Sequence, residues 1–189
     1  MHGAHTRTTV GLLHELGIPV EEFPPAASFD DVRTEFRRMG DALGKRSRAD
    51  AILAAFDAEL AELRARPVPD RRIALYYANS YSSGAGTLID EVVGAAGLRN
   101  IAHEFGLRGT GILPLEALVM ADPDIIAVAD QQYGTPALAQ QNFRHPAFLA
   151  FAARKQIAVL PSALTVCGGP FTLEAVRLLQ EAAKKTESR

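Results

Sequence analysis

The length, composition and charge of the chain exclude several classes of protein. Its 189 residues correspond to one domain, or to one domain with an appendage, at roughly 100–200 residues per domain. Hydrophobic residues make up 48% and charged residues 22%, which excludes a disordered chain, a collagen-like repeat and a coiled-coil rod. The formal net charge of −2 provides no basic field for phosphate backbones, so we expect no nucleic-acid partner.

The cysteine content and the apolar runs of the chain exclude further kinds of structure. Cys167 is the single cysteine, so an intramolecular disulfide and a cysteine-based zinc site are both excluded. Residues 1–20 contain no apolar core of a signal peptide, because His14 and Glu15 interrupt the short run that begins at Val10. No stretch reaches the ~20 apolar residues of a membrane span. The sequence as given therefore predicts a soluble chain without an export signal.

The first third of the chain is predicted to be mainly helical. A short helix over residues 8–16 is followed by a brief strand over 18–23. Apolar residues spaced by three and four predict a helix from Ser28 to about residue 43, and a second apolar stripe predicts one over 47–66. At 1.5 Å per residue the latter is about 30 Å long, which is the diameter of a small domain.

From about residue 70 the pattern changes to strands alternating with helices. Three continuous apolar segments are predicted strands: 72–78, 124–129 and 157–161. The predicted helices are 87–96, 114–121, 145–156 and 170–184, with a short extended segment at 100–102. Because apolar strands that alternate with helices are typical of parallel sheets covered on both faces, the sequence predicts an α/β domain with a mainly parallel sheet.

The segment 79–87 is the first candidate ligand-binding segment, because it connects a predicted strand to a predicted helix. Its Gly84-Ala85-Gly86 run lacks the third glycine of a dinucleotide fingerprint, and no Gly-Lys-Ser/Thr follows for a P-loop. Open α/β sheets place their sites at the carboxyl ends of strands, so we predict a ligand-facing loop, with a plain connecting turn as the alternative.

Other reactive residues do not form a recognisable catalytic pattern. The five histidines are scattered without metal-ligand spacing, and no Gly-x-Ser-x-Gly motif occurs. Cys167 is expected to be a spectator thiol rather than a nucleophile. The residues alone therefore predict no enzyme, no metal site and no resident cofactor.

The four tyrosines all lie in or just after predicted strands. Alternation sends Tyr76 and Tyr77 to opposite faces of the sheet, where core packing is the simplest interpretation. Tyr81 and Tyr133 fall in loops, and we expect them at a ligand or at the surface.

Several segments together resemble one family. Residues 87–100, the Leu-Pro-Leu-Glu-Ala-Leu block at 113–118, the Ala-Asp-Pro-Asp-Ile-Ile block at 121–126 and residues 169–176 resemble the substrate-binding proteins of ABC importers for ferric siderophores, haem and cobalamin. In that family two α/β lobes are bridged by a long rigid helix, and the ligand lies in the cleft between them. The resemblance covers essentially the whole chain.

The resemblance implies a division of the chain into three parts. Residues 1–27 resemble a remnant of an N-terminal lobe, residues 28–69 the bridging helical segment, and residues 70–189 a Rossmann-like C-terminal α/β lobe. It also implies that most of the N-terminal lobe is truncated here, so we expect this chain alone to bind a ligand weakly or not at all. The resemblance also implies a location in the periplasm.

The resemblance also implies functional residues. Glu116 matches the acidic position by which a C-terminal lobe docks on arginines of the permease, whereas a favourable charge on the first helical turn is the alternative. In that family the ligand contacts of the C-terminal lobe come from the loops after its strands. In this sequence the corresponding loops contain Tyr81, Ser82, Ser83, Arg108, Thr110, Gln132, Tyr133, Leu164 and Cys167. Arg108 would suit an anionic chelate or a haem propionate, with a surface arginine as the equal alternative.

These observations leave three hypotheses for function. The first is a solute-binding component of an ABC importer that carries an iron-siderophore, haem or cobalamin-type ligand to transmembrane permease subunits. The absence of tryptophan mildly disfavours haem and cobalamin. The second is a small α/β enzyme that binds a phosphorylated substrate at the 82–87 loop. The third is a homodimer in which the bridging helix and the predicted 18–23 strand pair with a second copy.

Overall fold

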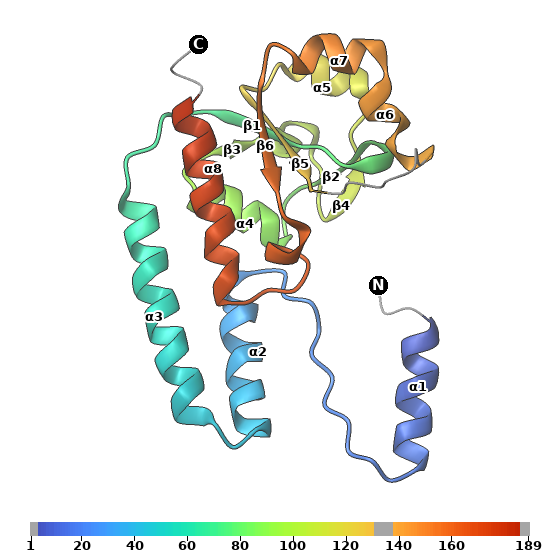
Figure 1. Ribbon diagram of the computed structural model, residues 1–189, viewed down its shortest axis with the longest axis vertical. Coiled ribbons are helices and arrows are strands. Elements are labelled where there is room, and N and C mark those ends of the chain that lie inside the picture. The colour runs from blue at the N-terminus through green and yellow to red at the C-terminus, as the bar shows by residue number, and fades with distance from the viewer. Residues whose placement is uncertain (1–3, 131–137, 186–189) are drawn as a thin grey trace.

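The computed structural model describes residues 4–130 and 138–185 and shows an α/β lobe attached to a pair of long helices (Figure 1). The α-helices are α1 (Ala4–Glu15), α2 (Phe29–Ala42), α3 (Arg46–Ala65), α4 (Leu88–Ala95), α5 (Leu115–Ala121), α6 (Gln141–Arg144), α7 (Pro146–Ala152) and α8 (Leu173–Lys185). The 3-10 turns are η1 (Ala78–Ser80), η2 (Ile101–Phe105), η3 (Leu138–Gln140), η4 (Ser162–Leu164) and η5 (Pro170–Thr172).

The main sheet of the lobe is parallel, as the continuous apolar strands predict. The strands are β1 (Arg72–Leu75), β2 (Tyr81–Ser83), β3 (Arg99–Asn100), β4 (Thr110–Ile112), β5 (Ile125–Ala129) and β6 (Gln156–Leu160). Four of them pair in the order β3-β1-β5-β6, and every pair is parallel. Strands β2 and β4 form a separate antiparallel pair in segments that the sequence pattern leaves as loops.

Helices cover both faces of the main sheet and complete two apolar cores. Ile73 and Leu75 of β1 face the larger core, which α3, α4 and α8 close. Ala74 and Tyr76, the alternate residues, face the second core, which α5 and α7 close. Alternation along a strand explains this division. It also confirms that Tyr76 and Tyr77 point to opposite faces, since Tyr77 packs against the larger core.

The two long helices form an antiparallel hairpin beneath the lobe (Figure 1). The Ser28 side chain caps α2 by accepting from the Asp31 N–H at 3.0 Å, which confirms the predicted helix start at Ser28. Near the far end, Gly40 lets the helices approach so closely that a Cβ there would lie 2.5 Å from the Ala49 Cβ. The apolar stripe of α2 is buried only at its lobe end, because Met39 and Leu43 lie beyond the lobe and are exposed.

Polar contacts fix this hairpin to the lobe. The Phe29 N–H, at the start of α2, donates to the Glu91 carboxylate of α4 at 2.8 Å. Arg177 of α8 forms an ion pair with Glu59 of α3. Gly168 makes a further close contact, because a Cβ there would come within 2.7 Å of the Ala26 Cβ. The hairpin is therefore held at both of its ends nearest the lobe.

The segment that precedes the hairpin differs from the prediction. The expected strand at 18–23 is wrong, because residues 18–27 contain no strand in the structure. Pro19 and the Pro24-Pro25 pair remove backbone donors, and none of the described strands pairs with this segment. The homodimer hypothesis therefore loses one of its two pairing elements, the strand, and keeps the bridging helix. Helix α1 lies apart from the hairpin at the end of this extended connection (Figure 1).

Candidate functional site

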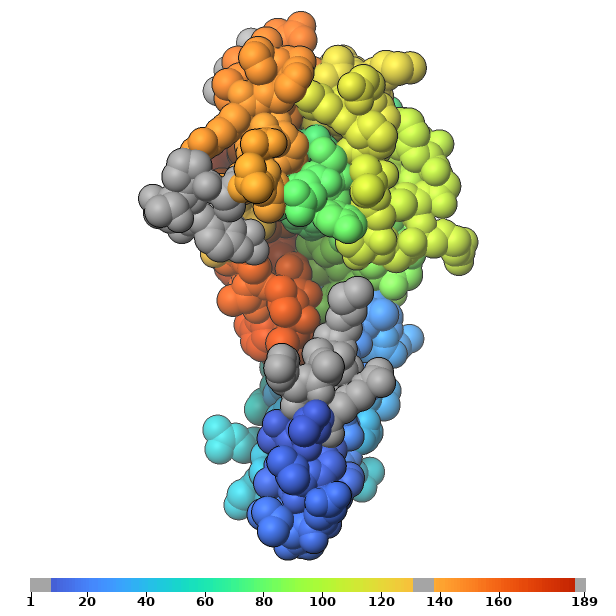
Figure 2. Space-filling model, turned by 90° about the vertical axis from the view of Figure 1, so that its right-hand side faces the viewer, coloured from blue at the N-terminus to red at the C-terminus, as the bar shows by residue number. Residues whose placement is uncertain are grey.

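A cavity of about 950 Å³ opens at the edge of the lobe where strands β1, β5 and β6 end. Its described walls come from some of the residues within the segments 25–27, 77–89, 110, 128–129, 140–152 and 157–166. In Figure 2 the α6–α7 segment (orange) and the β2 segment (green) lie on the same face of the lobe, above residues of the 160s (orange-red). The volume lies at the upper end of the range for small-molecule sites.

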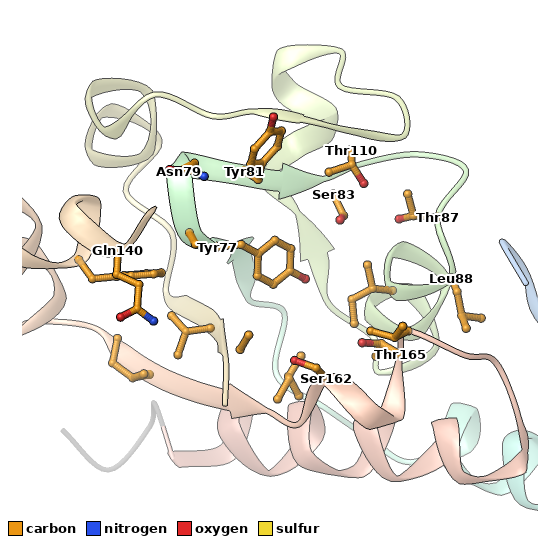
Figure 3. A pocket seen from close by; sticks show the side chains of 18 of the residues that line it. Tyr77, Asn79, Tyr81, Ser83, Thr87, Leu88, Thr110, Gln140, Ser162 and Thr165 are labelled. Atoms are coloured by element: carbon orange, nitrogen blue, oxygen red, sulfur yellow. The ribbon is translucent and has the colours of Figure 1, made fainter. Parts of the chain in front are cut away.

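Tyr77, two residues beyond the end of β1, provides the central aromatic surface of the cavity (Figure 3). Burial raises the pKa of Tyr77 to about 12, and a hydrogen bond to Ser83 partly offsets this effect. The hydroxyl is therefore a neutral donor at physiological pH. Asn79 and Ser80 follow with φ of 55° and 57°, a left-handed backbone that turns the chain back so that the Tyr77 N–H donates to the Tyr81 carbonyl at 2.8 Å.

The β2–β4 pair forms the wall beside Tyr77. Ser83 pairs with Thr110 across the two strands, and both side chains line the cavity. Gly84 follows against the main chain of residue 107, where a Cβ would lie 2.0 Å from the Leu107 carbonyl oxygen. Only glycine can lie so close to the main chain of residue 107, and this contact holds the 84–87 loop near β4.

The start of α4 also borders the cavity, but its polar groups are engaged within the loop. The Thr87 hydroxyl donates to the Gly84 carbonyl at 2.8 Å and accepts from the Asp90 N–H at 3.3 Å. Thr87 is thus the N-cap of α4, which explains the local turn without a ligand. The Leu88 and Ile89 side chains continue this wall as apolar surface.

An aromatic cluster carried by α6 and α7 builds another wall of the cavity. Phe143 of α6 packs edge-on against Tyr76, with ring centroids 5.8 Å apart, and Phe148 of α7 stacks on Tyr76 at 5.5 Å. Phe143 and Phe148 both line the cavity. Asn142 fixes α6 further, because its side-chain amide donates to the Tyr77 carbonyl at 2.8 Å. Arg144, the last residue of α6, lies at this wall as well.

The floor of the cavity comes from the ends of β5 and β6. Val128, Ala129 and Leu160 give it an apolar surface. The Asp130 carboxylate joins the two strand ends, because it accepts from the Ser162 N–H at 3.0 Å and from the Ser162 hydroxyl at 3.1 Å. These two hydrogen bonds lower the pKa of Asp130, and the bond from the Ser162 N–H has the larger effect.

The structure brings together only some of the site residues that the family resemblance implies. Tyr81, Ser83 and Thr110 line the cavity. Ser82, Arg108, Leu164 and Cys167 are absent from its described lining. Gln132 and Tyr133 lie outside the described residues. In Figure 3, Tyr81 lies on the other side of β2 from the Tyr77 ring, at the rim.

Local geometry explains where the other implied residues lie. Ser82 is fully buried, because strand alternation in β2 turns it away from the neighbouring Ser83. Leu164 packs against the larger core. Arg108 and Cys167 are exposed at the surface. Glu116 is exposed on the first turn of α5.

Several lining residues were missed by the sequence pattern. The sequence pattern favours the core for Tyr77 and predicts no element over residues 138–144, although Tyr77, Gln140, Phe143 and Arg144 line the cavity. No local signal marks this segment, because α6 is only four residues long and its contact with Tyr76 determines its place. Within residues 4–130 and 138–185, no group of three His, Cys, Asp or Glu side chains is arranged to hold a metal ion.

Comparison with known proteins identifies similar chains. The model of the family described as "Periplasmic binding protein" matches residues 11–164. A cobalamin-binding protein of Halobacterium salinarum is 31% identical over 125 residues, which are 63% of this chain and 34% of that protein. The chain thus spans about a third of the curated relative that it matches.

Solved structures share the fold over nearly the whole chain. The apo periplasmic haem-binding protein RhuT from Roseiflexus sp. RS-1 has a TM-score of 0.78 at 22% identity, covering 95% of this chain and 72% of that one. The periplasmic haem-binding protein HutB of Vibrio cholerae has a TM-score of 0.77 at 16% identity, covering 93% and 71%. An ABC-type Fe3+-hydroxamate transport protein from Saccharomonospora viridis gives 0.71 at 20%, covering 90% and 63%. None of the described helices has the length and apolar character needed to cross a membrane.

Proposed function

The chain belongs to the periplasmic binding protein family, and we propose that it is the solute-binding component of an ABC importer for an iron-siderophore, haem or cobalamin-type ligand. The cavity at the ends of β1, β5 and β6 is the observation that carries this proposal. Open α/β sheets bind ligands at this edge. The relatives named for cobalamin, haem and ferric hydroxamate support the ligand class.

The lining of the cavity suits a large ligand with an apolar body. Tyr77, Phe143 and Phe148 present aromatic surface, and Val128 and Leu160 present aliphatic surface. Burying such a ligand against these side chains gains free energy at roughly 25 cal/mol per Å² of apolar surface. The neutral Tyr77 hydroxyl and the Ser83 and Thr110 side chains supply the few polar groups that orient a bound molecule.

Binding and release without a chemical step is the activity that we propose. The proposed site combines apolar walls with neutral hydroxyls, and the loop proposed for a phosphorylated substrate uses its Thr87 hydroxyl to cap α4. No specific observation favours the enzyme hypothesis.

The helical hairpin is proposed to act as a rigid connection. We assign residues 1–27 to an N-terminal lobe, residues 28–69 to a bridging segment, and residues 70–189 to a C-terminal lobe. The contacts of Phe29 with Glu91 and of Arg177 with Glu59 support a rigid joint between hairpin and lobe. A rigid joint would limit how far two lobes move when a ligand enters the cleft.

Docking of the loaded protein is proposed to use Glu116. The side chain is exposed on α5 and is free to meet arginines of a transmembrane permease subunit. The periplasm is the proposed location, in keeping with the family.

Ligand titration tests this function. The purified chain would be titrated with haemin, cyanocobalamin and a ferric hydroxamate siderophore, and binding followed by ligand absorbance and calorimetry. The sequence leaves open that a single lobe binds no ligand, but the cavity of about 950 Å³ in the described lobe narrows this expectation. We expect weak one-to-one binding, with Kd in the micromolar range or above, for at least one of the three. Phe148→Ala should weaken it by about tenfold or more, because it removes an aromatic wall. Phe148 also packs in the second core, so thermal unfolding of the variant is measured to establish that it is folded at the temperature of the titration.

A matched variant separates the cavity from nonspecific adsorption. Phe171 is 48% exposed and is not among the cavity residues, so Phe171→Ala should leave the affinity unchanged. No binding of any of the three ligands, or equal losses in both phenylalanine variants, would contradict the proposed function.

A further inference from the structure

The turn that follows β1 contains two consecutive residues with a left-handed backbone. Asn79 and Ser80 have φ of 55° and 57°, and they are two of the three non-glycine residues with positive φ within residues 4–130 and 138–185. In this region the Cβ of an L-residue lies too close to the following carbonyl oxygen, so such residues usually occur singly. Asparagine tolerates the conformation better than serine does. The Ser80 backbone therefore depends on contacts that hold it in place.

The hydroxyl of Tyr76 makes one of these contacts. Its oxygen lies 2.9 Å from the Ser80 Oγ, which is a hydrogen-bond distance. Tyr76 is fully buried, so water does not compete for its hydroxyl. The Ser80 carbonyl is held as well, because it accepts from the Leu113 N–H at 2.8 Å. The Tyr76 bond acts through the Ser80 side chain, whose position depends on the φ of its own backbone.

The turn at residues 79–80 lies at the cavity, but the bond that holds it does not. Tyr77, Asn79 and Tyr81 all line the cavity (Figure 3). Tyr76 and Ser80 are absent from its described lining. A change at the Tyr76 hydroxyl therefore reaches a bound ligand only through the residues beside Ser80.

The ring of Tyr76 contacts a different wall of the cavity. It stacks on Phe148 with centroids 5.5 Å apart and meets the Phe143 ring edge-on at 5.8 Å. The ring thus supports the α6–α7 wall, whereas the hydroxyl supports the turn before β2. Because a phenylalanine at position 76 would keep the ring, the role of the hydroxyl can be tested without removing the aromatic cluster.

We propose that the Tyr76 hydroxyl is a positioning group for ligand binding, which holds Ser80 in its left-handed conformation and so fixes Asn79 and Tyr81 at the cavity. This inference rests on the proposed function. Without the hydroxyl, Ser80 can relax toward the commoner backbone conformations, and its neighbours lose their fixed places. A ligand would then have to order the turn as it binds, and this ordering costs free energy.

Two substitutions at Ser80 isolate the backbone conformation from the hydrogen bond. Tyr76→Phe is made alone and in combination with Ser80→Gly or with Ser80→Ala, and neither double variant can form the bond. Glycine adopts a positive φ readily, whereas alanine does not. The wild type and the variants would be titrated with haemin, cyanocobalamin and a ferric hydroxamate siderophore, and binding followed by ligand absorbance and calorimetry.

We expect Tyr76→Phe to bind about fivefold or more weakly than the wild type, which is the effect of one lost hydrogen bond between neutral groups. The double variant with Ser80→Ala should be as weak, whereas the one with Ser80→Gly should recover most of the affinity. Gln180→Met is the control for stability, because it removes a buried hydrogen bond outside the described lining. It should lower the urea midpoint and leave the affinity unchanged.

Hydrogen exchange of the free chain gives a readout that needs no ligand. The Tyr77 N–H donates to the Tyr81 carbonyl and the Leu113 N–H donates to the Ser80 carbonyl, both at 2.8 Å, so these two amides report on the turn. They should exchange faster in Tyr76→Phe and in its combination with Ser80→Ala. The combination with Ser80→Gly should restore their protection.

The outcomes separate this proposal from the proposed function. If the wild type binds a ligand and Tyr76→Phe binds it as tightly, or if the glycine and alanine double variants are equally weak, the positioning role is overturned while the proposed function stands. The same holds if Gln180→Met weakens binding as much as Tyr76→Phe does, because the loss then follows general stability. If the wild type binds none of the three ligands, both the inference and the proposed function fail.

Discussion

The side-chain amide of Gln180 in α8 donates a hydrogen bond to the main-chain carbonyl of Leu63, near the end of α3, at a distance of 2.8 Å. Gln180 is only 3% exposed, so this bond lies within the interface between α8 and α3. The Leu63 carbonyl also accepts from the N–H of Arg66, the C-cap of α3, at 3.2 Å, so Gln180 supplies this carbonyl with a second donor. A single side chain therefore links the C-terminal helix to the end of the hairpin.

Gln180→Glu should destabilise the chain strongly at neutral pH. The substitution keeps the shape of the side chain but replaces a donor with a buried carboxylate that faces a carbonyl oxygen, at a cost of about 3 kcal/mol. Burial would raise the pKa of the new carboxyl, so the loss should shrink as the pH falls and the protonated acid regains a donor. Urea denaturation across pH 4–7 measures this, with Gln141→Glu, at an exposed glutamine, as control. A loss that is the same at every pH would rule out the donor role.

Two glycines should respond to alanine in opposite directions. Gly84→Ala places a Cβ against the Leu107 carbonyl, which is held because it accepts from the Ala85 N–H at 3.1 Å. We expect a loss of about 3 kcal/mol together with weaker ligand binding, because the displaced loop borders the cavity. Gly94 lies within α4 with no atom within 4 Å of its virtual Cβ. Gly94→Ala should therefore stabilise by roughly 0.5–1 kcal/mol in thermal or urea unfolding. Equal effects of the two substitutions would contradict the close approach.

The sheet and its helices follow from the sequence, because their signals are local. The apolar runs that became β1 and β5 are almost wholly buried on both faces, whereas β6 is an edge strand whose Val159 is 54% exposed. The Ser28 cap marks the start of α2. The strand predicted at 18–23 fails for the opposite reason. A strand needs a partner, and an apolar run does not reveal whether one exists.

The candidate site is harder to predict because tertiary contacts decide it. Helix α6 is too short for periodicity, and its place depends on Phe143 packing against Tyr76, which lies 67 positions away in sequence. Ser82 and Ser83 look equivalent in a loop. The pairing of β2 with β4 buries the first and directs the second into the cavity. A register shift of one residue would reverse the two, and no local signal fixes it.

Glu116→Gln should separate docking from ligand binding. Glu116 lies on α5 and is absent from the described cavity lining, so the affinity for ligand should not change. If it meets arginines of a permease, ligand-stimulated ATP hydrolysis by the importer in vesicles should fall by about tenfold or more. Glu181→Gln, at another exposed carboxylate, is the control. If Glu116 only complements the helix dipole, the variant would lose about 0.5 kcal/mol of stability and support normal ATP hydrolysis.

Tyr77→Phe should change how stability depends on alkaline pH. In the folded chain burial raises the pKa of Tyr77 to about 12, whereas an unfolded tyrosine ionises near pH 10. A raised folded pKa contributes stability that is fully present below pH ~10 and is lost as the pH rises through the folded value, because the unfolded state ionises first. The wild type should therefore lose about 3 kcal/mol relative to Tyr77→Phe between pH ~10 and ~12. Denaturant unfolding of both proteins across this range gives the difference directly, and groups common to both cancel. A difference that stays constant with pH would show that Tyr77 ionises as freely in the folded chain as in the unfolded one.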